Sequence, residues 1–562
     1  MVEFHPGLIL LIGAAVVVMV SQRTAVVVAI ATAAIALVAA LSLGEDVTWN
    51  YDFYGIDLVA MRVDALSTPF MLVFAIVALV AMIYGSTTMS RTELAAGLAT
   101  AGAGIGVVLA GDLLTLFIFW ELKVTTVVVL IAARSRAGSA AAAMRYLRVH
   151  LIAGVVLLGG VIWLAVRSGS LAFEEVPWSG PGWLILGGFA FCAAAVPFHA
   201  WLPDAYPAAT VAGTVILSAY TTKSAVYALA RGFPGTELLI WVGVTMAVVG
   251  VIFAILEDDI RRLLSYHIVS QVGFMVTAIG VGTAAAINGA TAHATAHVLY
   301  KGLLLMGAGA VLYATGRSRT SELGGLARAL PVVLVLYLVG AFSISGVAGF
   351  SGFPAKELAV ASVGSGGETT AQWLLKFASV GTFASVALKL PALTFFGTPR
   401  SASVLRRVPV TMYAAMGVAA IANIAIGVRP GLLFDRLPTA EAFNAYTGAK
   451  LAESFALLAA TTAGVWLLRS RLAPKATTSL DTDAFYRELP ARLRTRFATE
   501  AAPGTVSDAP ADRVWRWPSL GAWAPERFAP GPVAPGWLLG STIAAAMVLV
   551  LAAIVMRGVV IG

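Results

Sequence analysis

The sequence predicts an all-α integral membrane protein with about 14–16 transmembrane helices. Of its 562 residues, 59 % are hydrophobic and only 12 % are charged, whereas about a quarter of the residues in soluble proteins are charged. The mean hydropathy is +0.89. Apolar stretches long enough to cross a hydrocarbon core of about 30 Å recur along almost the whole chain. Because lipid offers the backbone no hydrogen bonds, these stretches are expected to be helical.

Sixteen apolar segments are candidate membrane helices. They are 7–21, 24–43, 65–84, 93–111, 113–133, 147–166, 182–201, 209–230, 237–256, 262–281, 286–314, 330–362, 370–396, 408–428, 449–468 and 536–558. The first segment has no basic region before it and no small-residue cleavage site after it, so we expect it to be retained. Two stretches, Pro197–Pro207 and Gly346–Pro354, combine proline with small residues. A helix broken at membrane depth is tolerated only where it faces protein or a wet cavity.

Basic residues occupy alternate loops between these segments. They are Arg23; Arg91; Arg134, Arg136, Arg145 and Arg148; Arg261 and Arg262; Arg317, Arg319 and Arg328; Arg400, Arg406 and Arg407; and Arg469, Arg471 and Lys475. The opposite loops at 44–62 and 168–181 are acidic. The positive-inside rule then predicts a multi-pass protein of the cell inner (plasma) membrane with both termini outside. This pattern explains the net charge of +8 better than nucleic-acid binding does.

One long polar segment, 469–535, carries nine prolines and is predicted to be cytoplasmic. Within it, residues 482–498 are compatible with a short amphipathic helix on the membrane surface. Its apolar stripe is Phe485, Leu489, Leu493 and Phe497. A tethered linker is the equally favoured interpretation. A final transmembrane helix is expected within 536–562.

The chain offers no site for a cofactor or a metal ion. Its single cysteine, Cys192, lies in an apolar run, so a disulfide framework, an iron–sulfur cluster and a CxxC zinc site are all excluded. No nucleophile elbow, phosphate-binding glycine loop or HExxH pattern is present. The sequence therefore predicts a protein that is not itself an enzyme, and any redox chemistry would have to lie on a partner chain.

Ionisable residues inside the apolar segments are the most informative feature. They are Glu121, Lys223, His293, His297, Lys301, Lys356, Glu357, Lys376 and Lys389. Glu121 lies about 13 Å into its segment at 1.5 Å per residue, and His293, His297 and Lys301 share one helical face. Each residue alone is compatible with a structural ion pair or a snorkelling side chain. Because intramembrane charge is costly, the whole series favours a path for proton transfer.

Six separated motifs resemble a known family. They are Gly111–Glu121 (GDLLTLFIFWE); Pro197–Pro207 (PFHAWLPDAYP); Lys223–Tyr227 (KSAVY); Asp259–Tyr266 (DIRRLLSY) with Ser270–Phe274 (SQVGF); the face of His293, His297 and Lys301; and Ser351–Lys356 (SGFPAK). Their order over about 60–400 resembles the antiporter-like membrane subunits of Mrp-type cation/proton antiporters, respiratory complex I and membrane-bound hydrogenases. The resemblance is greatest to the D subunit of Mrp-type sodium/proton antiporters.

The resemblance implies two inverted five-helix repeats, each with a discontinuous helix. On this basis we divide the chain into N-terminal transmembrane helices (1–92), a first repeat (93–256), a second repeat (257–400), C-terminal transmembrane helices (401–468), the Pro-rich segment (469–535) and the final helix (536–562). The resemblance also implies a proton relay through Glu121, Lys223, His293, His297, Lys301 and Lys356. Lys301 is its central carrier and Lys356 its terminal lysine.

One position departs from the family's pattern. The family usually has a lysine five residues before the proline of the Pro197–Pro207 motif, where it pairs with the glutamate of the fifth helix, and this chain has Cys192. A thiol does not replace an ammonium group at neutral pH. Lys123 is a candidate substitute, although residues i and i+2 point about 200° apart. Alternatively, Lys123 faces a neighbouring helix or subunit. Asp204 and Lys389 are further candidate modulators.

Three functions from different classes are compatible with these residues. We favour a proton-translocating subunit of a multi-subunit Mrp-type monovalent cation/proton antiporter, whose partners are other integral membrane subunits, protons, a monovalent cation and the lipid bilayer. The alternative is a largely structural or proton-pumping subunit of a complex I-like, hydrogenase or bicarbonate-coupled complex, which Cys192 supports. A self-sufficient transporter of an organic substrate would need a polar pocket, and the sequence instead aligns lysines and histidines for a relay.

Overall fold

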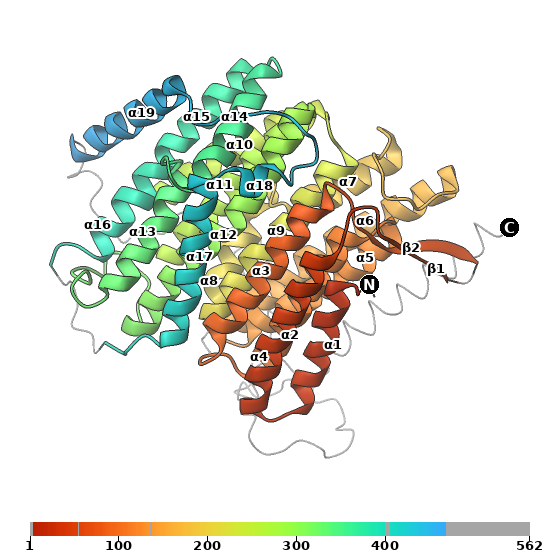
Figure 1. The fold of residues 1–562 in the computed structure, drawn as a ribbon, viewed down its shortest axis with the longest axis horizontal. Helices are drawn as coiled ribbons and strands as arrows, with labels where there is room; N and C mark the ends of the chain where they lie inside the picture. The colour runs from red at the N-terminus through yellow and green to blue at the C-terminus, as the bar shows by residue number, and fades with distance from the viewer. Residues whose placement is uncertain (1–3, 54, 135–137, 399–404, 468–562) are drawn as a thin grey trace, which may run out of the picture.

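The protein is a bundle of helices, as predicted (Figure 1). The computed structural model describes residues 4–53, 55–134, 138–398 and 405–467. Its elements are α1 (Pro6–Met19), α2 (Gln22–Ser42), β1 (Thr48–Phe53), β2 (Ile56–Arg62), α3 (Ser67–Gly85), α4 (Arg91–Leu109), α5 (Leu113–Ala132), α6 (Ser139–Ser168), α7 (Gly180–Cys192), η1 (Phe198–Ala200), α8 (Trp201–Ala208), α9 (Val211–Gly232), α10 (Glu237–Leu256), α11 (Ile260–Val281), α12 (Ala284–Thr315), α13 (Pro331–Ser345), α14 (Gly352–Ser365), α15 (Thr369–Thr382), η2 (Phe383–Lys389), α16 (Leu390–Thr394), α17 (Val410–Val428), α18 (Gly431–Phe434) and α19 (Gly448–Leu467).

The predicted apolar segments correspond closely to these helices. Within the described residues, ten helices are long and apolar enough to cross a membrane, and three shorter apolar helices accompany them. Helix α6 begins at Ser139, well before the predicted start at 147, after Gly138 with a φ of 92°. The predicted segment 469–535, its amphipathic helix 482–498 and the final helix in 536–562 lie outside the described residues.

Both predicted helix breaks are present. Helix α7 ends at Cys192, and the chain passes through Ala194, with a φ of 62°, before η1 and α8 resume. Helix α13 ends at Ser345 and is followed by Gly346, with a φ of 72°, before α14 begins at Gly352. Each break leaves main-chain carbonyls outside the helical ladder. Two carbonyls near the breaks accept hydrogen bonds from side chains. Trp201 Nε1 donates to the Phe191 carbonyl at 3.2 Å, and Lys356 Nζ donates to the Ile344 carbonyl at 3.0 Å.

A β-hairpin between α2 and α3 was not predicted. Strands β1 and β2 pair antiparallel, with Thr48 opposite Arg62 and Phe53 opposite Ile56, and a bulge follows Trp49. The hairpin is joined to the bundle because the Val59 amide donates to the Asp112 carboxylate at 2.8 Å. The acidic composition of 44–62 favoured a loop. The alternation of aromatic and polar residues in 49–53, which is typical of a strand, was therefore not used.

An ion-pair network fixes the chain just after this hairpin. Arg231, at the end of α9, donates to Asp64 at 2.6 Å, and Arg62 lies 3.4 Å from the same carboxylate. Burial alone would raise the pKa of Asp64, but the guanidinium groups of Arg231 and Arg62 outweigh it and lower that pKa. The network therefore ties the hairpin side of the molecule to α9, which carries Lys223.

Helices α11 and α12 form the centre of the bundle. Helix α12 packs against α9, α11, α13, α14 and α17. Helix α11 packs closely against α10, and a Cβ at Gly273 would lie 2.4 Å from the Gly243 carbonyl oxygen. Only glycine allows this approach of the two backbones. By contrast, α1, α2, α6, α10 and α17 expose large apolar side chains, as expected for helices that face lipid or other subunits.

Candidate functional site

Three ionisable side chains lie on one face of α12, as their four-residue spacing predicts. His293, His297 and Lys301 are completely buried. The ring centroids of the two histidines are 6.3 Å apart, and the Tyr300 ring lies 5.1 Å from His297. Within the described residues, neither imidazole nor the Lys301 Nζ has a hydrogen-bond partner. Because buried polar groups are normally satisfied by protein or ordered water, this face is suited to binding water.

Lys223 lies on α9, close to the α12 face. It is completely buried, and its Nζ donates to the Ser218 carbonyl at 2.9 Å and to the Thr222 hydroxyl at 3.1 Å. Electrostatic interactions connect Lys223 with Lys301 and with His297. No ion pair to Lys223 or Lys301 is recorded among the described residues. The two amines therefore share a buried region without a paired carboxylate among the described residues.

Lys356 lies at the other end of the α12 face, beside the second helix break. Its Nζ donates to the Ile344 carbonyl and lies 5.1 Å from the centre of the Phe274 ring. The same ring lies 5.8 Å from His293. Phe274, from α11, thus separates His293 from Lys356, although the sequence assigned it no role. An aromatic face can stabilise a passing cation through its quadrupole.

Glu121 and Lys123 are both buried on α5, with 7 % and 2 % exposure. The Glu121 Oε1 has no hydrogen-bond partner among the described residues. It faces Gly154 on α6, where a Cβ would lie only 2.3 Å from this oxygen. The Lys123 Nζ lies 4.0 Å from the centre of the Trp120 ring and also lacks a hydrogen-bond partner in the described part of the chain. Because Gly154 has no side chain, α6 leaves the space that the Glu121 carboxylate occupies.

Cys192 lies near this pair, at the end of α7, and is 3 % exposed. The Lys123 ammonium interacts electrostatically with Cys192 and with Glu121. Glu121 and Lys123 are two residues apart and so point in different directions on α5. Both side chains are nevertheless buried. Lys123 thus faces the protein interior, near the thiol of Cys192.

Of the buried histidines that the sequence did not assign to the relay, two interact electrostatically with its lysines or with Lys123. His150 on α6 stacks on Tyr146 at 3.9 Å and interacts electrostatically with Lys123. His267 on α11 hydrogen-bonds the Ser385 hydroxyl at 2.7 Å through Nε2. The signal that singled out His293, a histidine within an apolar helix, also applies to both of these residues.

His267 connects the α12 face to Lys389. It interacts electrostatically with Lys301, Lys356 and Lys389. Ser385 and Lys389 belong to η2, a π-helical turn, and such turns occur frequently at functional sites. The Lys389 Nζ donates to the carbonyls of Ile255 at 2.6 Å and Glu257 at 3.1 Å. Lys389 therefore also holds the end of α10.

Asp204 anchors the first broken helix. Its carboxylate accepts two hydrogen bonds from Arg145, at 2.6 and 2.9 Å, which joins α8 to α6. Arg261, from α11, donates to the carbonyls of Tyr206 and Ala209 at the end of α8, at 2.9 Å each. These interactions join α8 to α6 and to α11.

The described residues contain no group of three or more histidine, cysteine or carboxylate side chains arranged to hold a metal ion. They instead provide buried ammonium, imidazole and carboxylate groups on α5, α9, α11, α12 and α14. Groups of these types accept and release protons, and water can bridge them where they do not touch. The arrangement is therefore suited to moving protons through the bundle.

Comparison with known proteins gives consistent matches. The family model described as "NADH:quinone oxidoreductase/Mrp antiporter, TM" matches residues 110–385. NADH-quinone oxidoreductase subunit N of Desulforudis audaxviator is 31 % identical over 363 residues, which are 58 % of this chain and 71 % of that relative. Na⁺/H⁺ antiporter subunit A1 of Staphylococcus aureus is 29 % identical over 346 residues, 55 % of this chain. The match spans only 42 % of the length of that subunit.

Solved structures share the fold. A chain of the Mrp complex from Dietzia sp. DQ12-45-1b superposes with a TM-score of 0.71 at 23 % identity, over 81 % of this chain and 98 % of that one. A chain of respiratory complex I from Thermus thermophilus superposes with a TM-score of 0.67 at 23 % identity. The match covers 77 % of this chain and 100 % of that one. Together with the sequence matches and the paired helix breaks, these findings show that the chain belongs to the antiporter-like membrane subunits common to NADH:quinone oxidoreductases and Mrp antiporters.

Proposed function

We propose that this chain is the proton-translocating subunit of a multi-subunit Mrp-type monovalent cation/proton antiporter, in the role of the D subunit. Protons move along Glu121, Lys223, Lys301, His297, His293 and Lys356. Lys123, Cys192 and Lys389 modulate this relay, and Asp204 positions the first broken helix. The partners are other membrane subunits, and the transported species are protons and a monovalent cation.

The supporting observation is the buried row of Lys223, His297, His293 and Lys301, three of which lack hydrogen-bond partners within the described chain. A purely structural role would favour satisfied ion pairs, since an unpaired buried charge destabilises a fold by several kcal/mol, on the order of 3–5. Groups retained at such a cost in a membrane are usually functional. The row therefore favours proton transfer over packing.

We also propose the repeat boundaries 93–256 and 257–400, because each part holds one discontinuous helix, α7–α8 or α13–α14. The arginine-rich loops support an inner (plasma) membrane location with those loops in the cytoplasm and both termini outside. In this orientation the α14–α15 connection and the start of α19 face the outside.

The alternative is a structural or proton-pumping subunit of a complex I-like, hydrogenase or bicarbonate-coupled complex. Two points favour it: the relative from Desulforudis audaxviator is a subunit of an NADH-quinone oxidoreductase, and this chain has Cys192 where the resemblance implies a lysine. The thiol lies beside Lys123, so the loss of charge at Cys192 is partly offset.

Purification of the native complex through a tag on this chain tests the proposal. We expect several small membrane subunits to copurify, and Na⁺ or K⁺ to dissipate a pH gradient in vesicles that contain the complex. Choline chloride is the control for ionic strength. Copurification with iron–sulfur or flavin subunits, together with no response to either cation, would contradict antiport and support the alternative.

Exchange of Cys192 for lysine tests whether Lys123 serves the relay. In the otherwise unchanged chain, Cys192→Lys should lower transport, because two ammonium groups would then lie near Glu121 in a medium that screens charge poorly. Lys123→Met should also lower transport. The double variant should recover most of the loss, because one ammonium group again accompanies the carboxylate. The measurement is dissipation of the pH gradient on cation addition, normalised to complex yield.

Additive losses in the double variant would show that Lys123 and Cys192 act independently and would remove Lys123 from the relay. Cys192→Met provides the matched control, since it changes the volume of the side chain without introducing a charge.

A further inference from the structure

Helix α17 carries one polar side chain on its buried face, that of Asn423. The other buried residues of this helix are alanine, methionine and glycine, and Asn423 is completely buried among them. Burying an amide is unfavourable unless its donors and acceptors are satisfied. The Nδ2 atom donates to the Ala419 carbonyl of the same helix at 2.7 Å. The Oδ1 atom instead bonds outside its own helix.

The Asn423 Oδ1 joins the two sides of the second helix break. It accepts hydrogen bonds from the hydroxyl of Ser351 at 2.6 Å and from that of Ser343 at 3.2 Å. Ser343 lies near the end of α13, and Ser351 directly precedes α14. The two hydroxyl oxygens are 2.8 Å apart, and the Gly352 amide donates to the Ser343 Oγ at 3.1 Å. Because both serines are completely buried, removing this acceptor would leave a buried hydroxyl donor unsatisfied.

Helix α17 contacts the same break again one turn later, at Gly427. A Cβ at this position would lie 2.3 Å from the Gly349 carbonyl oxygen, so only glycine allows α17 to approach the break this closely. The Tyr446 hydroxyl donates to the Gly427 carbonyl and accepts from the Gly349 amide at 3.2 Å. Positions 423 and 427 share one helical face. That face of α17 is therefore fitted to the break over two successive turns.

This network holds both ends of the hydrogen bond made by Lys356. The Ile344 carbonyl, which accepts from the Lys356 Nζ at 3.0 Å, belongs to the residue after Ser343. Lys356 lies one turn beyond Gly352 on the same face of α14. The acceptor and the donor are thus each attached to a residue that is bonded within the Asn423 network. Since a reacting group misplaced by about 1 Å can lose about a hundredfold in rate, the geometry of this break bears on the relay.

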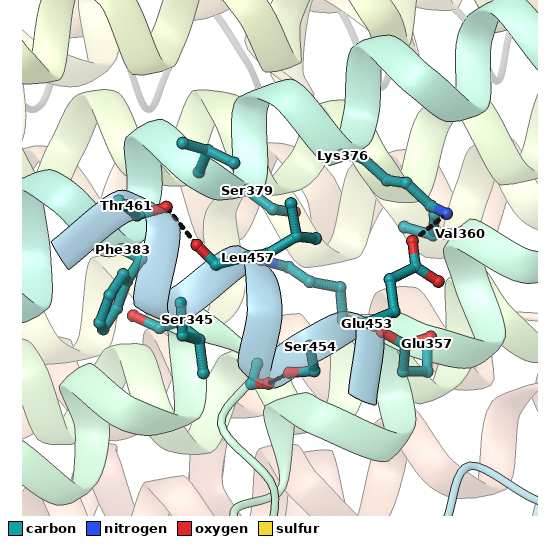
Figure 2. Close-up of a pocket in the computed structure, with 14 residues that line it drawn as sticks. Ser345, Glu357, Val360, Lys376, Ser379, Phe383, Glu453, Ser454, Leu457 and Thr461 are labelled. Atoms are coloured by element: carbon teal, nitrogen blue, oxygen red, sulfur yellow. Dashed lines mark hydrogen bonds and ion pairs between the residues drawn. The ribbon is translucent and has the colours of Figure 1, made fainter. Parts of the chain in front are cut away.

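On the side of α19, the contact with the break is more open (Figure 2). Lys356 and Gly346 line a small pocket there together with residues of α19. Ser454 of α19 donates to the Gly346 carbonyl at 3.2 Å. Ser454 is only partly buried, and among the residues of α19 only Thr461 is buried. Water can therefore replace this hydrogen bond when it is lost, whereas Ser351 is completely buried.

We propose that Asn423 is a positioning residue for Lys356: its amide oxygen fixes α13 against α14 across the break and so sets the place of the Lys356 amine beside the Ile344 carbonyl. The proposal rests on the proposed function, because it takes Lys356 as a member of the relay. Asn423 carries no proton itself, since a carboxamide does not titrate. A packing role at 423 would be met by any apolar side chain of the same size, whereas positioning requires a hydrogen-bond acceptor at this place.

Two substitutions at 423 separate these roles. Asn423→Leu keeps about the size of the side chain and removes the acceptor. Asn423→Asp keeps Oδ1, and a buried carboxyl group without a paired cation stays protonated, so that it can donate to the Ala419 carbonyl as the amide does.

Ser351→Ala removes a donor of the network and provides a second variant. Ser454→Ala is its matched control, because it also removes one serine hydroxyl that bonds to this break, from α19. Hydrogen–deuterium exchange of the break, measured by mass spectrometry on the assembled complex, reports its geometry independently of transport. The transport measurement is cation-dependent dissipation of a pH gradient in vesicles, normalised to complex yield.

We expect exchange at the Gly352 amide and its neighbours to become about fivefold faster in Asn423→Leu and in Ser351→Ala, the factor that corresponds to one ordinary hydrogen bond. Ser454→Ala should exchange as the unchanged chain does. The maximal rate of transport should fall about tenfold or more in Asn423→Leu, with an unchanged cation concentration at half-maximal rate, because the side chain acts on a proton carrier. Asn423→Asp should restore both exchange and transport.

Unchanged exchange in Asn423→Leu would overturn the proposal, and so would equal acceleration by Ser454→Ala. Faster exchange with full transport would overturn it as well, because the geometry of the break would then not govern the relay. Failure of Asn423→Asp to restore exchange would show that position 423 supplies something other than an acceptor. If the unchanged complex shows no response to cations, the proposed function fails, but faster exchange in Asn423→Leu and its recovery in Asn423→Asp would still support the hold of Asn423 on the break.

Discussion

Replacing Lys301 with alanine should abolish cation-dependent dissipation of a pH gradient while the complex still assembles. Lys301 lies on the same buried face as His293 and His297 and interacts electrostatically with Lys223. Removing the amine takes away the group that connects Lys223 with the histidines of α12. Loss of a side chain that transfers protons typically costs about a hundredfold or more in rate. The measurement is the initial rate of dissipation in vesicles, divided by the amount of complex recovered.

Lys301→Arg separates proton transfer from fixed charge. A guanidinium keeps the positive charge but does not release a proton under these conditions. We therefore expect this variant to be as inactive as Lys301→Ala. Transport at the rate of the unchanged complex in either variant would show that Lys301 carries no proton. Recovery of the partner subunits in normal amounts excludes misassembly as the cause of a loss.

Changing Glu121 to glutamine should lower transport about a hundredfold, the lower limit for loss of a proton-transferring group. Glutamine keeps the shape of the side chain, so the contact with Gly154 is retained, but it no longer accepts the proton. The Lys123 ammonium also loses its electrostatic interaction with the carboxylate. The same vesicle assay and the yield of complex provide the measurement.

Gly154→Ala tests the position of the Glu121 carboxylate without changing its charge. The new methyl group would lie 2.3 Å from Oε1, so the carboxylate must move. Gly159→Ala, on the same helix, is the matched control, because its added methyl group would have no atom within 4 Å. Full transport by Glu121→Gln would show that Glu121 only packs against α6, whereas an effect of Gly154→Ala alone would indicate a steric role.

Much of the membrane architecture could be predicted because hydropathy and backbone chemistry act locally. The breaks at Gly346 and Pro197 follow from glycine conformation and from the missing proline amide, neither of which depends on distant residues. The shared face of His293, His297 and Lys301 follows from helical periodicity alone. These features needed no knowledge of which helices are neighbours.

The features that could not be predicted from the sequence depend on tertiary contacts. His267 matters because α11 places it opposite Ser385, which is 118 residues away along the chain. The burial of Lys123 depends on neighbouring helices that cover α5, and helical projection alone does not predict them. The β1–β2 hairpin was missed because its strands are short and acidic, and its attachment through Asp112 is long-range.

The row formed by Lys223, His297 and Lys301 has a thermodynamic consequence. Its members are all cationic when protonated, they interact electrostatically, and no carboxylate pairs with either lysine among the described residues. Protonation along the row is therefore anticooperative, because a charge on one member disfavours a charge on the next. The favoured arrangements alternate between occupied and empty positions. In the proposed relay, a proton arriving at one end would therefore displace the charges along the row.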